Sequence, residues 1–315
     1  MGSFPGHAIP GSIFIFLGLW WIYATWLRYF ICRIQRKPFY ITTSFPFHCC
    51  AVGLKLPLEA FIVLFGTTVG IAVELGAGLQ RNVDQNGKSS FIFGANNLQH
   101  FAMYFMFFLV GILELLLHYR FPLPKHIDTV VGAIAFSAEG LLFYFHIHAR
   151  DPVDVQLHIL LVLAISATVI SGVFEIIQSE PKQVYATLMR GYFTVLQGVW
   201  FYQTAFILYS PFHAHYDITT DPEQHRTLML ISYYFVLHMA AILIIVLLLA
   251  LLANRVSKRY MTKTLDYEQI LIDETTVDKN DNYNDEGPEY DENKTMTNGH
   301  MKEQIKSQNS LLLNS

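Results

Sequence analysis

The chain has 315 residues, of which 53% are hydrophobic and 15% are charged. Ordinary soluble domains carry about 25% charged residues, so this composition argues against a water-soluble globule and excludes most soluble enzymes and nucleic-acid-binding proteins. The net charge of -4 is unevenly divided, because residues 1–260 hold 16 Lys and Arg against 13 Asp and Glu, whereas residues 261–315 hold 5 against 12. The sequence therefore predicts a membrane domain over residues 1–260 and an acidic cytosolic tail over residues 261–315.

Seven segments are long and apolar enough to cross a bilayer as helices. A spanning helix needs about 20 largely apolar residues, since the hydrocarbon layer is about 30 Å thick and each residue rises about 1.5 Å. In chain order the segments are 9–32, 56–79, 98–118, 129–148, 153–177, 184–209 and 228–253. They lack the alternating pattern of barrel strands. The expected fold class is an all-α integral membrane protein, a bundle of seven transmembrane helices with a disordered C-terminal tail.

The basic residues predict how the chain crosses the membrane. One set of connections, with the start of the tail, carries Arg33, Arg36, Lys37, Lys55, Arg120, Lys125, Lys182, Arg255, Lys258, Arg259 and Lys263. The opposite side carries only Arg81, Lys88, Arg150 and Arg226. Cytoplasmic connections are the ones enriched in Lys and Arg. We expect an endomembrane or plasma-membrane protein, surrounded by the lipid bilayer, with its N terminus luminal or extracellular and its C terminus cytosolic.

The tail holds too little apolar surface to offset the entropy of ordering, and disorder is expected over residues 261–315. Within it, Tyr267-Glu268-Gln269-Ile270 fits the Tyr-x-x-apolar form that sorting adaptors read as an extended strand. Sorting adaptors are therefore expected partners of this segment.

Histidines inside the spans are the main candidates for chemistry, because ionisable groups at membrane depth are costly and usually face the bundle interior. His100 lies near the luminal end of the third span, His146 and His148 near that of the fourth, and His158 near that of the fifth. Counted at about 1.5 Å per residue, their depths agree to within one helical turn. His238 lies deeper, on the last span. These five residues form the predicted metal-ligating set.

Helical spacing adds acidic partners to the histidines. Glu139 and His146 are seven residues apart on one face, and Asp154 lies four residues before His158, where its carboxylate can orient the imidazole. The fourth and fifth spans form a hairpin that turns near residue 151, which should bring their histidines together. On the third span, residues at spacings of three or four form one stripe, which consists of His100, Tyr104, Phe107, Gly111, Glu114 and His118. This stripe contains every ionisable side chain of the span.

Several functions suit such a group of imidazoles. Three neutral imidazoles with an open position make a catalytic zinc site, with Glu139 or Asp154 as the proton acceptor of a hydrolase-like reaction. Two histidines on different helices could instead ligate haem, and ionisable groups at this depth could also pass protons or ions. Histidines near an interface could equally bond only to water, backbone and each other. The second functional class is a non-enzymatic scaffold or receptor-like protein whose tail recruits trafficking partners.

Glu175 on the fifth span lies about 25 Å from the level of His158, too far to join the histidines. We expect it to cap the cytosolic end of its helix or to pair with Arg190.

Four stretches of sequence carry a resemblance to a known family. They read MGSFPGHAIPG followed by LGLWW at residues 17–21, QHFAMYF at 99–105, the run from Glu139 to His158, and LQGVWF at 196–201. In these stretches the chain resembles the transmembrane protein 45 family, which includes the transmembrane epididymal protein. The likeness covers roughly residues 1–260 and implies a multi-pass membrane protein without specifying an activity. The family often has two consecutive histidines at the place where this chain has Gln99-His100, so the chain departs from the family at Gln99.

Overall fold

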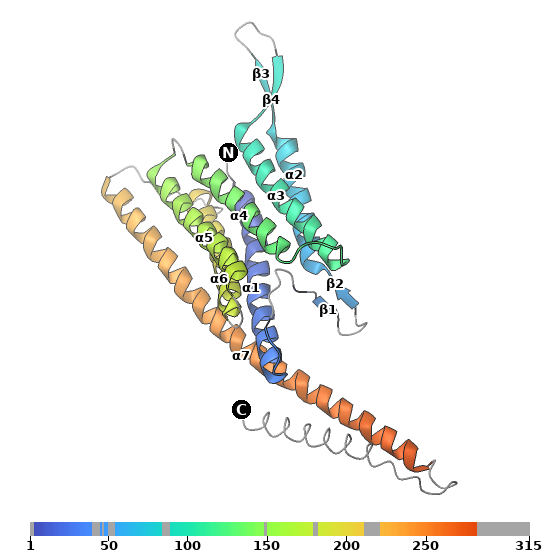
Figure 1. Cartoon of the computed structure of the whole chain (residues 1–315). Coiled ribbons are helices and arrows are strands. Elements are labelled where there is room, and N and C mark those ends of the chain that lie inside the picture. Colours follow the sequence, from blue (N-terminus) through green and yellow to red (C-terminus); the bar gives the residue numbers. More distant parts are fainter. Residues whose placement is uncertain are drawn as a thin grey trace.

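The structure is a computed structural model that describes residues 3–39, 45, 47–49, 54–83, 89–147, 150–178, 182–210 and 221–281. Its helices are α1 (Phe4–Ile34), α2 (Leu58–Gly78), α3 (Ala95–His118), α4 (Ile127–His146), α5 (Pro152–Ile177), α6 (Gln183–Leu208) and α7 (Asp221–Asp281). The helices run alongside one another as a bundle, with α7 crossing one side (Figure 1).

Local signals explain where two of the helices begin. The Ser3 hydroxyl accepts a hydrogen bond from the Gly6 amide at 3.2 Å, and Pro5 follows in the first turn, so α1 starts at Phe4, ahead of the predicted residue 9. Asp151 caps α5 in the same way, accepting from the Val153 amide at 2.9 Å, with Pro152 as the first helical residue. These two caps place His7 and His158 within the opening turns of their helices.

Six of the helices in the described chain, α1 to α5 and α7, are long and apolar enough to cross a membrane. α6 is as long as α5 but carries Arg190, Gln197 and Gln203. It packs against α1, α5 and α7, and both Arg190 and Gln197 are buried in the bundle. A helix enclosed by other helices can carry polar side chains without exposing them to lipid. The chain is therefore a mainly helical, multi-pass membrane protein.

Glycines allow α1 and α6 to approach backbone to backbone. A Cβ atom at Gly11 would lie 2.8 Å from the Gly198 carbonyl oxygen, and one at Gly198 would lie 2.8 Å from the Gly11 carbonyl oxygen. Gly18 and Gly191 repeat this arrangement one heptad further along. Small residues at such contacts let membrane helices pack closely.

Side chains between α5 and α6 form the centre of the core. Trp200 and Leu157 are fully buried, and the Trp200 indole donates a hydrogen bond to the Leu157 carbonyl oxygen at 2.9 Å. The outward faces of the helices are also apolar, as Phe65 on α2 and Leu251 on α7 illustrate with exposures of 74% and 60%. A bundle that is apolar on both its inner and outer surfaces is suited to lipid surroundings.

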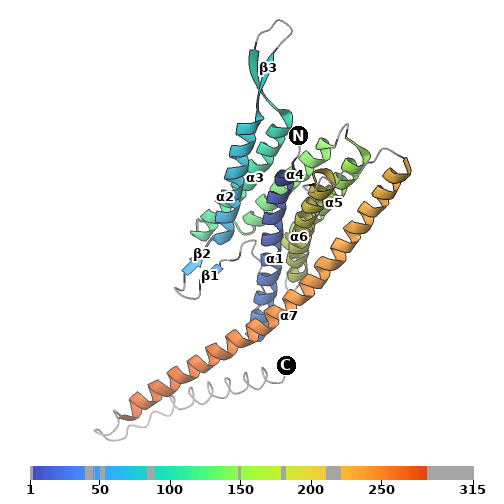
Figure 2. The same ribbon diagram turned by 180° about the vertical axis from the view of Figure 1, so that it is seen from behind.

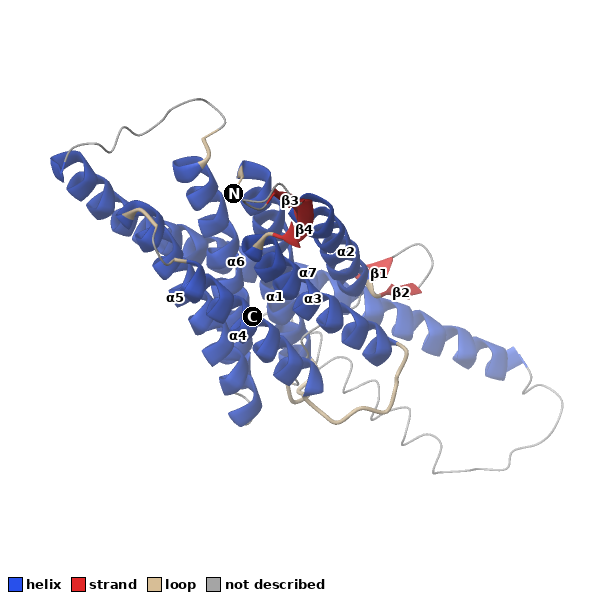
Figure 3. Ribbon diagram, turned by 90° about the horizontal axis from the view of Figure 1, so that it is seen from above, coloured by secondary structure: helices blue, strands red, loops and turns tan. Residues whose placement is uncertain are grey.

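Two small antiparallel hairpins were not predicted from the sequence. β1 (Phe47–Cys49) pairs with β2 (Leu54–Leu56), and β3 (Leu79–Val83) pairs with β4 (Ser89–Phe93). The second hairpin continues directly from α2 and leads into α3, beyond the end of the bundle. Figure 3, viewed from above, shows the strands as minor additions to a helical body.

The expected disorder of the tail is wrong for its first part. α7 continues past Tyr260 to Asp281, running beyond the bundle (Figures 1 and 2). Residues 261–281 contain no Gly or Pro, so the membrane helix can propagate without the cost of a new nucleus. Tyr267 and Ile270 lie within this helix, not in an extended strand. The expectation for residues 282–315 lies outside the described residues.

Candidate functional site

Four histidines from four helices meet at the end of the bundle where α1 begins. The ring centroids of His100 on α3 and His146 on α4 are 5.7 Å apart, and those of His146 and His158 on α5 are 6.0 Å apart. The ring centroid of His7 on α1 lies 6.2 Å from that of His158. We call His7, His100, His146 and His158 the histidine group.

An acidic residue on the same helix holds the ring of His158. Its Nδ1 lies 2.7 Å from Asp154 Oδ1 and 2.9 Å from the Asp154 carbonyl oxygen. The carbonyl oxygen and the oxygens of an ionised carboxylate can only accept, so Nδ1 is the nitrogen that donates; in the neutral form of the ring, Nε2 then has a free lone pair. His158 is 1% exposed, which fixes this orientation further.

His100 and His7 also place their Nδ1 atoms next to an oxygen atom. His100 Nδ1 lies 3.1 Å from Glu74 Oε1 on α2, and the other oxygen of Glu74 accepts a hydrogen bond from Asn97 at 2.8 Å. His7 Nδ1 lies 3.1 Å from the Ser3 carbonyl oxygen, and its ring packs 5.2 Å from that of Tyr209. Each ring therefore has its Nδ1 proton directed to an oxygen, as metal-ligating histidines commonly do.

His146, at the centre of the group, uses both of its nitrogens. Its Nδ1 lies 3.0 Å from Gln99 Oε1, and its Nε2 accepts from the guanidinium of Arg150. Arg150 also donates to Asp154 Oδ2 at 2.7 Å and to the His146 carbonyl oxygen at 2.9 Å. The guanidinium thus bridges a carboxylate and an imidazole, so it provides the positive charge in the middle of this site.

A cavity of about 170 Å³ adjoins the histidine group, lined by His7, His100 and Glu74 among other residues. Pockets for drug-sized molecules usually occupy about 300–1,000 Å³. The space suits an ion with its waters better than a haem. Within the described ranges, however, no three His, Cys, Asp or Glu side chains already stand in an arrangement that could hold a metal ion.

The remaining sequence-predicted residues lie elsewhere or are not described. His148 lies outside the described residues. His238 packs against Trp200 at 5.9 Å and places its Nδ1 2.7 Å from the Tyr234 carbonyl oxygen of its own helix. Glu139 is fully buried, and both of its carboxyl oxygens lie 2.8 Å from Gln197 Nε2. Glu139, which the sequence suggested as a proton acceptor, is therefore already hydrogen-bonded to Gln197.

The predicted set of site residues lacked three members of the site: His7, which the sequence placed just outside the first span, Glu74 and Arg150. The Ser3 cap and Pro5 could have extended the first helix to include His7. Glu74 is an acidic residue inside a predicted span, which is itself a signal for function. Arg150 lies in the turn between α4 and α5, and only the fold shows that its side chain returns to His146.

A second polar group lies in the bundle interior, away from the described contacts of the histidines. Arg190 donates from Nε to Glu175 Oε2 at 3.0 Å, which confirms the predicted pairing. The Arg190 guanidinium lies 4.4 Å from the ring centroid of Trp21, and Glu59 accepts hydrogen bonds from the indoles of Trp20 and Trp21. With Glu114, which interacts electrostatically with Arg190, these form the acid–arginine group: Glu59, Glu114, Glu175 and Arg190.

Residues 125–251 match a protein family described as "Family of unknown function (DUF716)". The match covers α4, α5, α6 and the membrane part of α7. It includes His146, Arg150 and His158 of the histidine site, together with Arg190, but not His7 or His100.

Proposed function

We propose that the protein is a seven-span membrane protein that binds a divalent metal ion through the histidine group on its luminal side. Zinc is the ion that we expect at this site. The observation that carries this proposal is the shared state of His7, His100 and His158. Each has its Nδ1 next to an oxygen acceptor, so that in the neutral ring Nε2 is the nitrogen with a lone pair for a metal ion.

The ring spacing supports a site that closes on an ion. Imidazoles that share one tetrahedral zinc at about 2.0–2.1 Å from each nitrogen have ring centroids about 5.2 Å apart. The neighbouring centroids in the histidine group are 5.7, 6.0 and 6.2 Å apart. Shifts of the rings by about 1 Å or less would bring neighbours to the spacing that zinc needs.

Arg150 acts as the internal competitor of the metal ion in this proposal. Its guanidinium holds His146 Nε2 and Asp154, both of which a bound cation would attract. Side-chain exposures of 21% for Arg150 and 14% for Asp154 leave the arginine a route to water when a cation replaces it. Arg150 and the ion then take turns as the cation beside Asp154, so the carboxylate is never left without one.

The proposal is one of ion binding and does not extend to hydrolysis. Glu139 is bonded to Gln197, and Asp154 holds both His158 and Arg150. A proton acceptor for a metal-bound water has to be within hydrogen-bond reach and uncommitted, and neither residue meets that requirement.

Two features support the seven-span topology and its orientation. α6 is 26 residues long, enough for a bilayer at about 1.5 Å per residue, and its polar side chains face neighbouring helices. The distribution of basic residues over the connections supports a luminal or outer position for the N terminus, and with it for the histidine group. The chain's resemblance to the transmembrane protein 45 family fits a multi-pass membrane protein of this kind.

The direct test is zinc-dependent thermal unfolding of the purified full chain in detergent. Zinc at 100 times its dissociation constant should stabilise the wild type by about 2.7 kcal/mol, because an ion bound only by the folded state adds its binding free energy. His158→Gln should abolish this gain, whereas His118→Gln, at the opposite end of α3, should retain it. Equal zinc responses of both variants would refute the histidine group as the binding site.

A further inference from the structure

A separate cavity of about 100 Å³ lies inside the bundle among α1 to α6. Its walls are mostly apolar and include Phe14, Val63, Phe107 and Phe136. An engineered apolar cavity of about 150 Å³ in a soluble protein binds benzene, so this space suits one ring or a short stretch of hydrocarbon. None of the histidine group lines it.

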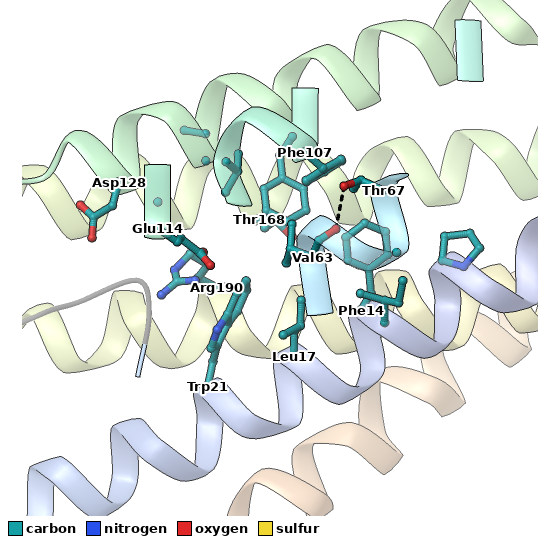
Figure 4. Close-up of a pocket in the computed structure, with 18 of the residues that line it drawn as sticks. Phe14, Leu17, Trp21, Val63, Thr67, Phe107, Glu114, Asp128, Thr168 and Arg190 are labelled. Atoms are coloured by element: carbon teal, nitrogen blue, oxygen red, sulfur yellow. Dashed lines mark hydrogen bonds between the residues drawn. The ribbon is translucent and has the colours of Figure 1, made fainter. Parts of the chain in front are cut away.

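One end of this cavity is polar, as Figure 4 shows, where Glu114, Asp128 and Arg190 gather opposite Phe14 and Phe107. Glu114 is 8% exposed and Arg190 is 6% exposed. Within the described part of the chain, Glu114 Oε2 and Arg190 Nη2 have no hydrogen-bond partner. Buried polar atoms are normally satisfied, so one unpaired acceptor and one unpaired donor at the same cavity indicate a missing polar group.

The charges at this end select the kind of head group. Arg190 is the one cation among the lining residues, and it is already paired with Glu175, whereas Glu114 and Asp128 are both acidic. An anionic head such as a carboxylate or phosphate would therefore be repelled by the Glu114 carboxylate, whose Oε2 atom has no hydrogen-bond partner within the described residues. A hydroxyl group carries no charge, and it can accept a hydrogen bond from Arg190 while donating one to Glu114.

We propose that the cavity binds the hydroxyl-bearing end of an uncharged lipid alcohol. The hydroxyl lies between Glu114 and Arg190, the first ring or the first few carbons lie against Phe14 and Phe107, and the rest of the hydrocarbon stays outside the cavity. A sterol and a long-chain alcohol share this chemistry. The membrane supplies such molecules at high local concentration. Binding satisfies both unpaired atoms and fills the apolar space, so one ligand accounts for both features of the cavity.

Glycines provide a matched pair of variants for the test. Gly132 lines the cavity, and a Cβ atom there would meet no other atom within 4 Å. Leucine at this position should occupy the ligand space without a backbone clash. Gly76 on α2 also has nothing within 4 Å of its Cβ position, but it does not line the cavity. Gly76→Leu therefore controls for adding leucine to a membrane helix.

The experiment measures binding of tritiated cholesterol and tritiated 1-hexadecanol to the purified full chain in detergent, with palmitate and hexadecane as competitors. Gly132→Leu should weaken binding at least tenfold while keeping the thermal midpoint, and Gly76→Leu should bind as the wild type does. Glu114→Leu should also weaken binding, and Glu114→Gln should restore part of it. Preference for cholesterol or for hexadecanol identifies a sterol or a chain alcohol as the ligand. Unchanged binding by Gly132→Leu, competition by palmitate as strong as by alcohol, or no binding of either probe would overturn the proposal.

Discussion

Two polar groups inside the apolar body of the protein differ in how deeply their charges are buried. Beside the histidine group, Arg150 and Asp154 are partly exposed, and Nδ1 of each of the four rings lies next to an oxygen atom. In the acid–arginine group, Arg190 and Glu175 have side-chain exposures of 7% and 1%, yet Arg190 Nη2 and Glu175 Oε1 lack partners within the described residues.

This difference separates a group that can exchange partners from one that cannot. Partly exposed charges can turn to water, so breaking their contacts costs little and a new cation can enter. Fully buried charges have no such alternative, and removing one partner leaves the other uncompensated. The histidine end is therefore suited to reversible ion binding, and the acid–arginine group to holding the helices and the cavity wall in place.

The largest expected effect comes from removing the buried arginine. Arg190→Met should lower the free energy of unfolding by about 3–5 kcal/mol, because Glu175 is left as a buried charge without its partner. The same substitution at the other end, Arg150→Met, should cost about 1 kcal/mol or less, because that pair is partly exposed. Denaturant unfolding in detergent measures both. Similar losses for the two variants would show that burial does not distinguish the groups.

A second prediction tests whether the buried pair acts as a unit. The double variant Arg190→Met with Glu175→Leu should recover more than half of the stability that Arg190→Met alone loses, since replacing a buried ion pair by apolar residues is often neutral. The comparison is a double-mutant cycle measured by the same unfolding assay. Additive losses from the two single substitutions would mean that the cost of Arg190→Met lies in its contacts with Trp21 or Glu114.

A smaller effect should appear in zinc affinity at the histidine end. Arg150→Met should tighten zinc binding about tenfold, because a charged hydrogen bond to His146 of about 1.5 kcal/mol no longer competes with the ion. Isothermal titration at a fixed pH gives the dissociation constants, with Arg226→Met at the start of α7 as a control for charge. Weaker zinc binding by Arg150→Met would show that the arginine supports the ion instead of competing with it.

Much of the fold follows from the sequence, because a bilayer demands long apolar helices and the chain supplies them with clear caps. The predicted start of the fifth span at residue 153 differs from the start of α5 by one residue, since Asp151 and Pro152 mark it. The extension of α7 past Tyr260 was not predicted, because the composition becomes polar there and polar composition indicates disorder. The absence of Gly and Pro from residues 261–281 was the signal for a continuing helix. The pairing of Arg190 with Glu175 was one of the two roles that the sequence suggested for Glu175, and the structure shows this one.

The details of the candidate site depend on features that no pattern in the chain contains. The rings of His100, His146 and His158 lie at one end of the bundle, at the depth that counting residues indicates. Which rotamer brings Arg150 back onto His146 is decided by packing at the turn, not by spacing. The cavity beside Glu114 and Arg190 likewise arises where side chains from several helices leave space, and helical periodicity says nothing about such gaps.

The most direct test of the account is zinc K-edge X-ray absorption of the zinc-loaded wild-type protein. Zinc bound by the histidine group should have two or three imidazole nitrogens at about 2.0–2.1 Å as its main ligands. The spectrum should also show the outer-shell scattering that is typical of histidine rings. His158→Gln, which should no longer bind zinc at this site, should lose this histidine signal. A first shell made of sulfur at about 2.3 Å, or of oxygen alone, would contradict binding by the histidine group.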